Sequence, residues 1–435
     1  MIGLLLIGSG AREVAIARKI KESSSSTLLY CIASTTNPQI KNLSKLYFEQ
    51  SPSEVSNVLE LIKNLSIDLA IIGPENPLEA GLVDALEKIG IPCVGPKRGV
   101  AKIETSKAFA RNILDLCSAE MNPERKEFVT VDGVEDFLRH LNEEYVIKYD
   151  GLMGGKGVKI SGEHLHSIEE SLAYASSIVS GGGTFLVEEK ILGEEFSLMS
   201  FCDGTTCAHM PLVQDHKRAF DGDVGPNTGG MGTYSFANHS LPFLSEKDVL
   251  EAQQTNERVA LELYKQTGQR FRGILYGGFM LTKSGVKVIE YNARFGDPEA
   301  MNVLSILETD FLDICNAIVS GSIANLKISF KNEATVCKYA VPNGYPNNPS
   351  KNFEVKCNPR ENNLYLAAVQ KTKGKIMATG SRTAAFVGIN KEINVAEQIA
   401  EKGICEVKGK LFHRKDVGTN KLINHRIRNM KELLG

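Results

Sequence analysis

The sequence predicts a multidomain protein of mixed α/β and α+β class whose first domain is a parallel sheet flanked by helices. Three observations support this prediction: a length of 435 residues, a hydrophobic content of 42%, and apolar strands that alternate with amphipathic helices up to about residue 100. The length corresponds to about three domains of roughly 150 residues, and the hydrophobic content is enough for their cores. The alternation is typical of parallel strands joined by crossover helices.

The first domain is expected over residues 1–103. Its strands are predicted at residues 4–7, 28–33, 69–72 and 92–94, and its helices from residue 12 and at residues 52–64 and 79–89. Ser51-Pro52-Ser53-Glu54 is typical of a capping box with proline at the first helical position, and Gly90 is a C-terminal helix stop.

Two further domains are expected in the rest of the chain. The second covers residues 104–330 and contains a smaller unit at about 121–190, and the third covers residues 331–435. The elements predicted here are helices over residues 104–116 and 395–401, strands over 286–292, 334–341 and 365–369, and an exposed excursion over 342–359.

Charge and cysteine usage exclude several classes of protein. Fifty basic and 52 acidic residues give a formal charge of −2, so nucleic acid and membrane surfaces are not expected partners. Nine cysteines are scattered without a C-x-x-C pair or a cluster with histidine, which favours reduced thiols in the cytoplasm and neither zinc nor disulfides. No apolar run suits a signal peptide or approaches the roughly 18 residues of a membrane helix.

A glycine turn, Gly8-Ser9-Gly10-Ala11-Arg12-Glu13, follows the first strand. Such a turn at a helix start lets backbone N–H groups approach an anion. A dinucleotide site is disfavoured because Glu13 occupies the third glycine position and no acid ends the second strand. Two interpretations stay open: Arg12 binds a small phosphate with Glu13 near a sugar hydroxyl or amine, or the turn is a capped surface turn with Arg12 in solvent.

Other polar positions also suggest a site but have plain alternatives. Glu75 lies between two prolines at the same edge of the sheet. It is either a carboxylate positioned for a ligand or part of a rigid loop without a ligand. Lys148 lies in an apolar strand and Lys156 in a glycine loop, and both positions suggest an anionic partner. The loop has two possible interpretations: a flap that folds over a triphosphate, or a hairpin turn whose lysine is solvated. Glu188 and Lys190 are expected on one face of a strand. Either Lys190 contacts the edge of a nucleotide base, or the two residues form an ion pair on the surface.

The strongest local signal is the pair Glu290 and Asn292, two residues apart on a predicted strand. Both oxygens then point the same way, as in sites that hold magnesium beside phosphates. Arg294 and Asp297 follow at once and add an anion clamp and a further acid. His216, between charged neighbours, is expected to be exposed and not a general base. Together these groups suit an ATP-dependent ligase that needs no protein nucleophile.

With these motifs in this order, the chain resembles the phosphoribosylamine–glycine ligases, ATP-grasp enzymes of purine biosynthesis, along essentially its full length. The motifs that carry the resemblance are GPENPL at 73–78, SKAF at 106–109, GGKGV at 154–158, EEKILGEE at 188–195, QDHKR at 214–218, GPNTGGMG at 225–232, RFGDPE at 294–299 and HRKDVG at 413–418.

The resemblance implies an ATP-grasp fold with a parallel N-terminal domain and a small mixed C-terminal domain, and it implies roles for particular residues. ATP with Mg²⁺ or Mn²⁺ and the two substrates, glycine and 5-phosphoribosylamine, would share one site. The implied nucleotide contacts are Lys107, Lys148 and Lys156 at the phosphates, Glu188, Glu189, Lys190 and Ile191 at adenine, Glu195 at ribose, and Arg218 and Asn227 in the pocket wall. Glu290 and Asn292 would hold the metal, Asp215, Arg294 and Asp297 would orient glycine and its acyl phosphate, and Gly10, Arg12, Glu13 and Glu75 would face phosphoribosylamine.

The resemblance also implies glycinamide ribonucleotide as product, a glycyl phosphate intermediate, and a monomer or weak homodimer in the cytoplasm. Three positions depart from the family pattern: Ala11 replaces a glycine, Val14 a histidine and Tyr149 an alanine, and the tyrosine is expected to narrow the nucleotide pocket. The rival interpretations are another ATP-grasp ligase or carboxylase, and a nucleotide sensor without turnover.

Overall fold

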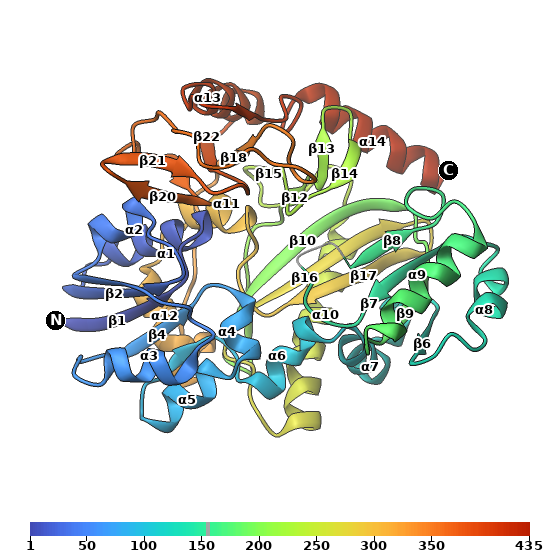
Figure 1. Cartoon of the computed structure of the whole chain (residues 1–435), viewed down its shortest axis with the longest axis horizontal. Coiled ribbons are helices and arrows are strands. Elements are labelled where there is room, and N and C mark those ends of the chain that lie inside the picture. Colours follow the sequence, from blue (N-terminus) through green and yellow to red (C-terminus); the bar gives the residue numbers. More distant parts are fainter. Residues whose placement is uncertain (154–156) are drawn as a thin grey trace.

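A computed structural model describes residues 1–153 and 157–435 of the chain. Four sheets surround a common centre (Figure 1): a parallel sheet, a smaller antiparallel unit opposite it, a long antiparallel sheet between them, and a C-terminal sheet that covers one side. In the described ranges, the structure has no helix that is both long and apolar enough to cross a membrane.

The N-terminal sheet has five parallel strands in the order β3-β2-β1-β4-β5. Its strands are β1 (Ile2–Ile7), β2 (Thr27–Ala33), β3 (Leu46–Glu49), β4 (Leu69–Ile72) and β5 (Cys93–Val94). Its helices are α1 (Ala11–Glu22), α2 (Pro38–Leu43), α3 (Val55–Ile62), α4 (Glu75–Glu79) and α5 (Leu82–Lys88). Leu4 and Leu6 of β1 join one hydrophobic core while Leu5 and Ile7 join another, so this strand is buried on both faces.

The smaller unit is an antiparallel sheet, β6-β9-β7-β8, with two helices on it. Its elements are β6 (Arg125–Phe128), α8 (Val134–His140), β7 (Tyr145–Tyr149), β8 (Val158–Ile160), α9 (Ile168–Ser180) and β9 (Phe185–Glu189). Helices α6 (Arg98–Thr105) and α7 (Lys107–Cys117) and the turn η1 (Ala119–Met121) lead into it from the first sheet. Phe128, Tyr145 and Phe185 belong to its separate core.

The long antiparallel sheet runs β11-β10-β16-β17 and forms the floor between the two outer units. It comprises β10 (Gly193–Cys202), β11 (Cys207–His209), β16 (Gly273–Thr282) and β17 (Gly285–Asn292), with helices α10 (Glu246–Thr267), α11 (Glu299–Ser305) and α12 (Phe311–Ser320) and the turn η2 (Ile323–Asn325) around it. Glu290 and Asn292 therefore lie at the end of the edge strand β17.

The C-terminal sheet combines segments from two distant parts of the chain. Its order is β12-β15-β18-β22-β19, with β23 paired to β18. Its strands are β12 (Gln214–Asp215), β15 (Gly232–Ser235), β18 (Ala334–Pro342), β19 (Leu364–Leu366), β22 (Ala384–Asn390) and β23 (Leu411–Phe412). Two hairpins, β13 (Arg218–Phe220) with β14 (Val224–Asn227) and β20 (Val369–Thr372) with β21 (Lys375–Ala378), and two helices, α13 (Ile393–Cys405) and α14 (Asn420–Leu434), complete this region.

Most predicted strands and helices are present, and several boundaries are corrected. The expected capping box is wrong: Glu54 donates its N–H to the Ser51 carbonyl (3.2 Å), and α3 begins only at Val55. The helix expected over residues 104–116 is broken at Ser106, whose extended backbone ends α6 while its hydroxyl caps α7. The helix expected over 79–89 begins only after Gly81, which has a φ of +83°.

Candidate active site

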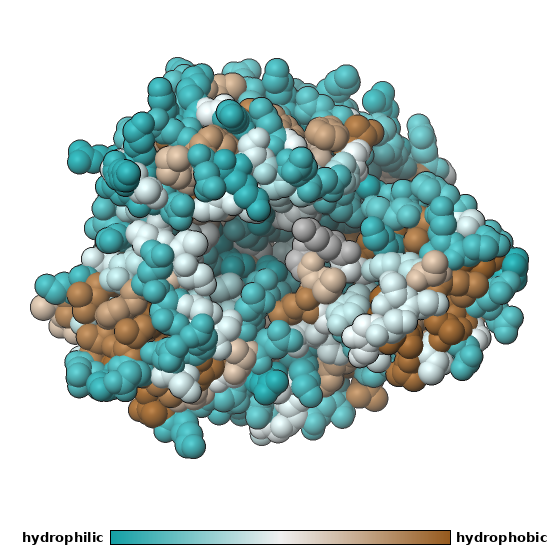
Figure 2. Space-filling model, in the orientation of Figure 1, coloured by the Kyte–Doolittle hydropathy of each residue, from teal (hydrophilic) through white to brown (hydrophobic). Residues whose placement is uncertain are grey.

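A polar cavity of about 700 Å³ lies where the four sheets meet. Figure 2 shows this face of the molecule hollowed at its centre, with mainly hydrophilic walls. Residues from the regions around all four sheets reach the cavity, among them Arg12 of α1, Lys148 of β7, Glu290 of β17 and Arg382 before β22. Positions that are hundreds of residues apart in sequence therefore share one site.

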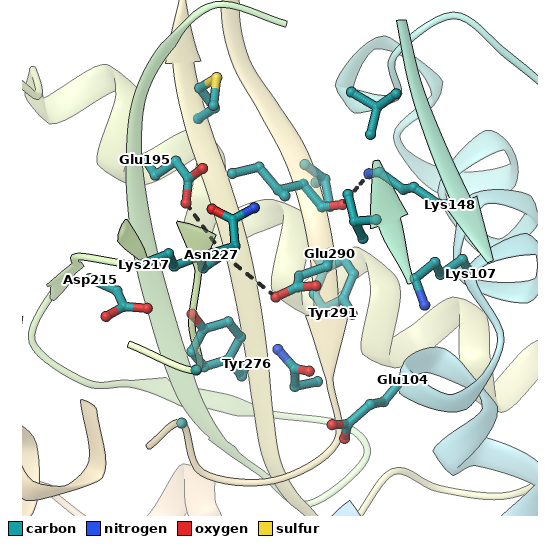
Figure 3. Close-up of a pocket in the computed structure, with 18 of the residues that line it drawn as sticks. Glu104, Lys107, Lys148, Glu195, Asp215, Lys217, Asn227, Tyr276, Glu290 and Tyr291 are labelled. Atoms are coloured by element: carbon teal, nitrogen blue, oxygen red, sulfur yellow. Dashed lines mark hydrogen bonds and ion pairs between the residues drawn. The ribbon is translucent and has the colours of Figure 1, made fainter. Parts of the chain in front are cut away.

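Glu290, labelled in Figure 3, and Asn292 of β17 line this cavity together, as their spacing predicts. Lys217 extends from the end of β12, with its Nζ 3.8 Å from Glu290 Oε1 and 3.3 Å from Glu195 Oε2. Glu195 is the main cause that raises the pKa of Lys217, and burial alone would lower it. Burial alone would raise the pKa of Glu290, but Lys217, Lys107 and Lys148 outweigh burial and lower it. Glu290 is therefore a carboxylate at neutral pH.

The donor chemistry of this pair fits a hard divalent cation. A carboxylate oxygen and an amide oxygen on one strand face are the ligand types that Mg²⁺ and Mn²⁺ take in proteins, usually with waters and substrate phosphates as the other ligands. Lys217 and Lys107 lie close by and provide positive charge for a polyphosphate.

Lys148 is held in a buried network with Glu188 and Arg111. Its Nζ lies 2.6 Å from Glu188 Oε2, and Arg111 donates to both Glu188 oxygens at 2.7 Å. Burial would raise the pKa of Glu188, but Arg111 and Lys148 outweigh it and lower the pKa to about 2. Arg111 also donates to the carbonyls of Val288 and Ile289, which ties the smaller unit to β17.

Lys107 occupies the first turn of α7 beside the end of β7. Its backbone N–H donates to Asp150 Oδ1 (2.5 Å), and its Nζ donates to the Gly151 carbonyl (3.0 Å). This places an ammonium group at the entrance to the loop that was predicted as a flap. Lys156 lies outside the described residues.

The segment expected to read adenine lines the cavity through Glu189, Lys190 and Ile191. Strand β9 ends at Glu189, so strand alternation does not extend to Lys190 as expected. Lys190 instead contacts Glu144 (3.1 Å) and the Ser161 carbonyl (3.3 Å), away from the partners of Glu188. The segment 188–191 is therefore fixed by two sets of ion pairs, those of Glu188 with Arg111 and Lys148 and that of Lys190 with Glu144.

Two neighbouring acids, half-buried Asp215 and buried Glu299, line the cavity. Tyr276 donates its hydroxyl to Glu299 Oε1 (2.9 Å), and the backbone N–H of His216 donates to Asp215 Oδ1 (2.7 Å). Burial and then the neighbouring Glu299 raise the pKa of Asp215 well above its usual range, and burial raises that of Glu299. Both shifts favour the protonated acid or a cationic ligand beside these groups.

A second charged cluster lies at the parallel sheet, around Arg12 and Arg294. Both guanidinium groups donate to the Phe295 carbonyl at 3.1 Å. Arg294 also contacts Glu104 (2.9 Å) and Glu75 (3.3 Å). Burial alone would raise the pKa of Glu75, but Arg294 and Arg12 outweigh burial and lower it. Arg12 is buried and lines the cavity, which excludes a surface turn with Arg12 in solvent.

The glycine turns after β1 and β4 make room for Glu13, not only for a ligand. Glu13 accepts from the Gly10 N–H (2.5 Å) and from Arg12 Nε (2.6 Å). A Cβ added at Gly73 would lie 2.2 Å from Glu13 Oε1, and one at Gly8, where φ is +114°, would lie 2.8 Å from its side chain. Of the described turn residues, Arg12 faces the cavity while Gly10 and Glu13 lie behind it.

The remaining predicted residues lie on the C-terminal side of the cavity. Asp297 accepts from the Tyr339 hydroxyl (2.7 Å) and pairs with Arg382 (3.4 Å). Arg218 and Asn227, on the hairpin β13–β14, both line the cavity, and Arg218 forms an ion pair with Glu163 of the smaller unit.

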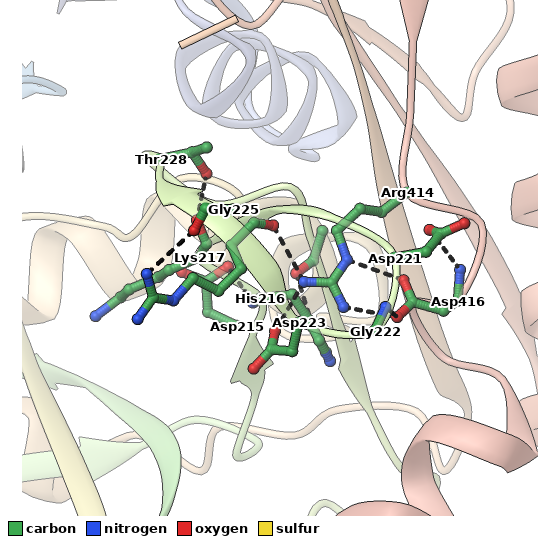
Figure 4. A network of polar contacts seen from close by, with 12 residues as sticks. Asp215, His216, Lys217, Asp221, Gly222, Asp223, Gly225, Thr228, Arg414 and Asp416 are labelled. Atoms are coloured by element: carbon green, nitrogen blue, oxygen red, sulfur yellow. Dashed lines mark hydrogen bonds and ion pairs between the residues drawn. The ribbon is translucent and has the colours of Figure 1, made fainter. Parts of the chain in front are cut away.

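Arg414 holds this hairpin to the C-terminal segment (Figure 4). Its side chain is fully buried and contacts Asp223 (2.8 Å), Asp416 (2.8 Å) and the Arg218 carbonyl (3.1 Å). The HRKDVG motif thus stabilises the β13–β14 hairpin, which carries the cavity-lining residues Arg218 and Asn227.

His216 is not exposed, which corrects the expectation. Its ring is buried, Nδ1 lies 3.1 Å from the Gly232 carbonyl, and burial followed by the charges of Arg426 and Arg414 lowers its pKa to about 3. His216 is therefore neutral, and it lies outside the cavity lining.

Comparisons with known proteins agree along the whole chain. Three family models match in succession: the phosphoribosylglycinamide synthetase N domain at residues 2–104, its ATP-grasp (A) domain at 105–300 and its C domain at 335–420. The phosphoribosylamine–glycine ligase of Methanosarcina barkeri is 47% identical over 433 residues, covering 99% of this chain and 100% of that protein. The chain belongs to the phosphoribosylglycinamide synthetase family.

Solved structures support the same fold. The phosphoribosylamine–glycine ligase of Thermotoga maritima has a TM-score of 0.80 at 25% identity, covering 95% of this chain and all of that one. The biotin carboxylase domain of a Hydrogenobacter thermophilus 2-oxoglutarate carboxylase has a TM-score of 0.69 at 14% identity, covering 99% of this chain and 93% of that one, and shows the fold alone. The predicted family resemblance and ATP-grasp fold are confirmed.

In this member of the phosphoribosylglycinamide synthetase family, the three departures lie away from the cavity lining. Ala11 and Val14 are fully buried in α1. Tyr149 packs into the core of the smaller unit, where a Cβ on Gly183 would lie 2.6 Å from its ring. The expectation that Tyr149 narrows the nucleotide pocket is wrong for the described residues, because the ring lies between Gly151 and Gly183 and does not line the cavity.

Within the described ranges, nine charged residues that line this synthetase-family site were not predicted from the sequence. They are Glu104, Arg111, Glu163, Glu194, Lys217, Asp223, Glu299, Arg382 and Arg426. Lys217 and Glu299 lie inside the quoted motifs QDHKR and RFGDPE and were detectable there. Glu104, Arg111 and Arg382 have partners far along the chain, such as Arg111 with Glu188, so only the fold brings them together.

Proposed function

We propose that this chain ligates glycine to 5-phosphoribosylamine at the expense of ATP, giving glycinamide ribonucleotide, ADP and phosphate in purine biosynthesis. The observation that carries the proposal is the 47% identity, over practically the full length of both chains, to a phosphoribosylamine–glycine ligase. Its cavity, with lysines on one wall and two neighbouring acids in its lining, is suited to a polyphosphate and a small ammonium compound.

ATP is placed between the smaller unit and β17. Lys107 and Lys148 are assigned to its phosphates, with Lys156 as an expectation from the sequence, and residues 188–191 to adenine. Glu195 is assigned to the ribose, with Arg218 and Asn227 in the opposite wall. In support, the biotin carboxylase domain of similar fold was solved with magnesium and ADP.

Glu290 and Asn292 are assigned to Mg²⁺ or Mn²⁺ on the strength of their donor chemistry and position. When bound, this cation neutralises charge on the phosphate oxygens during transfer. Lys217 and Lys107 add fixed positive charge at the same wall.

The two substrates are assigned to the two charged clusters. The acids Asp215 and Glu299 suit the ammonium group of glycine, because a nearby cation relieves the cost of their buried charge. Arg12, Arg294 and Glu75 suit phosphoribosylamine, with the arginines at its 5′-phosphate. Gly10 and Glu13 position Arg12 from behind, and Asp297 with Arg382 closes the side toward the C-terminal sheet.

The proposed reaction has two steps. A glycine carboxylate oxygen attacks the γ-phosphorus of ATP, ADP leaves, and glycyl phosphate forms. The amine of phosphoribosylamine then attacks the glycyl carbonyl carbon, phosphate leaves, and the amine loses a proton as the amide forms. Exclusion of water from the cavity during the reaction would protect the acyl phosphate from hydrolysis.

The test is phosphate release from MgATP with glycine and freshly generated phosphoribosylamine, omitting each substrate in turn and recording the product mass. We expect release that requires both substrates and a product with the mass of glycinamide ribonucleotide. Release with a different acid or amine would assign the chain to another ATP-grasp ligase, and ATP binding without any product would indicate a nucleotide sensor.

The cellular setting is also proposed. A net charge of −2 and nine free cysteines are consistent with a cytoplasmic enzyme whose partners are small molecules and not nucleic acid or membrane. We propose that it acts as a monomer or weak homodimer, which sedimentation analysis would test.

A further inference from the structure

Away from the active-site cavity, three side chains with metal-ligating atoms meet beside the C-terminal sheet. Glu401 and Cys405 lie one turn apart on α13, and His413 follows β23. A carboxylate oxygen, the thiol sulfur and a ring nitrogen of these residues lie within 4.8 Å of one another. Carboxylate, imidazole and thiolate groups are the side chains that bind zinc in proteins, and one of each meets here.

Cys405 and His413 both approach the same oxygen of Glu401. Cys405 Sγ lies 3.6 Å from Glu401 Oε1, and His413 Nε2 lies 3.0 Å from the same oxygen. Zinc bonds of ordinary length at tetrahedral angles separate sulfur and oxygen ligands by about 3.6 Å and nitrogen and oxygen ligands by about 3.4 Å. The sulfur–oxygen distance equals the zinc value, and the nitrogen–oxygen distance is shorter, so His413 would move slightly away from Glu401 when an ion binds.

The other oxygen of Glu401 is held by a buried lysine. Lys338, fully buried on β18, donates to Glu401 Oε2 (2.7 Å), Glu397 Oε1 (2.5 Å) and the Lys415 carbonyl (2.8 Å). These bonds hold Oε2, while Oε1 contacts Cys405 and is the nearer oxygen to His413, at 3.0 Å against 3.2 Å for Oε2. The positive charge of Lys338 is balanced by Glu397. Glu401 and a Cys405 thiolate then carry the two negative charges that a divalent ion requires.

The cluster is accessible from solvent. Cys405 is exposed, and a cavity of about 220 Å³ lined by Cys405, His413 and Lys408 lies beside it. A fourth ligand such as water therefore has space, while three protein ligands come from the chain. Three protein ligands with one open position is a common zinc arrangement.

We propose that Glu401, Cys405 and His413 form a binding site for zinc or a similar borderline-soft divalent metal, separate from the magnesium site. On binding, the Cys405 thiol gives its proton to solvent and the thiolate coordinates the ion. The bound ion joins α13 to the segment after β23, next to Arg414 and the hairpin that it supports. The sequence does not predict this zinc site, because its ligands follow no C-x-x-C spacing and meet only through the fold.

The test is titration of the full chain with Co²⁺, in excess Mg²⁺ to occupy the oxygen-only site, followed by displacement with Zn²⁺. We expect one ion per chain and a thiolate-to-cobalt charge-transfer band, which oxygen ligands alone do not give. The Cys405→Ser variant should lose the band and bind zinc at least about tenfold more weakly. Because Cys405 is exposed, this change should leave the fold intact, which circular dichroism checks.

The matched control is Cys117→Ser, a half-buried thiol on α7, which should keep the band. Zinc should also raise the melting temperature of the wild type and of Cys117→Ser but not of Cys405→Ser. The absence of a charge-transfer band in the wild type, or an equal band in Cys405→Ser, would overturn the proposal.

Discussion

At the scale of single residues, Glu290 depends on its neighbours for its charge. Lys217, Lys107 and Lys148 keep it ionised despite burial. We expect Glu290→Gln to lower kcat/KM by about 100-fold and to raise the magnesium requirement, because the amide is a weaker ligand for a hard cation. Steady-state assays across a magnesium series measure both effects. Glu60→Gln on α3, an exposed site, is the control, and near-normal turnover of Glu290→Gln at ordinary magnesium would remove Glu290 from the metal role.

Glu188 makes a prediction about pH and stability. Its pKa of about 2 lies below the ordinary 4.5, so its ion pairs with Arg111 and Lys148 stabilise the fold above pH 4.5 and are lost as the pH falls toward 2. Glu188→Gln leaves two buried cations poorly paired and should cost about 3 kcal/mol of unfolding free energy at pH 7.

Denaturant unfolding of both proteins at several pH values measures this difference. It should be about 1 kcal/mol smaller at pH 4 than at pH 7, because the unfolded wild-type chain is then largely protonated at this position. Glu127→Gln, exposed on the neighbouring strand β6, is the control and should change little. A difference that stays constant or grows on acidification would contradict the assigned pKa.

At the scale of elements, the turns after β1 and β4 act together through Glu13. Gly73→Ala would push a methyl group against Glu13 and displace Arg12, so we expect a loss of about 1–3 kcal/mol in stability. The KM for phosphoribosylamine should rise while that for ATP stays the same. Gly181→Ala, whose added Cβ would meet nothing closer than 3.4 Å, is the control in both assays. Wild-type values for Gly73→Ala would show that Glu13 does not fix Arg12.

Elements were predictable from sequence where burial gives a simple pattern. The buried runs at residues 4–7 and 69–72 correspond to β1 and β4. Strand β3 was missed because it is only half-buried, and α2 because it has six residues. The break at Ser106 was missed because a single side-chain cap, which leaves the helical periodicity unchanged, separates α6 from α7.

The site was predictable to the extent that its chemistry lies in local motifs. Glu290 with Asn292 could be found by spacing on one strand, and Lys148 by its place in an apolar run. Roles that arise from long-range pairs could not be read in this way: Asp297 meets Arg382, and Arg294 meets Glu104, only in the folded chain. The burial of His216 was also unpredictable. Its neighbours in sequence are the charged Asp215 and Lys217, but in the folded chain its ring lies beside the aromatic ring of Tyr234.

At the scale of the whole molecule, the C-terminal segment holds part of the active-site wall in place. Arg414 and Arg426 both contact Asp223 at the turn of the hairpin that carries Arg218 and Asn227. Arg414→Ala should remove the arginine that Asp416 pairs with and one of the two arginines at Asp223, leaving Arg426 there, and should lower stability by about 3 kcal/mol. Because the hairpin is then less firmly held, the KM for ATP should rise more than the KM for glycine. Unfolding measurements and substrate titrations test these effects, with Arg428→Ala, exposed on α14, as the control. A loss of stability with unchanged KM for ATP would mean that Arg414 supports the fold but not the position of the nucleotide wall.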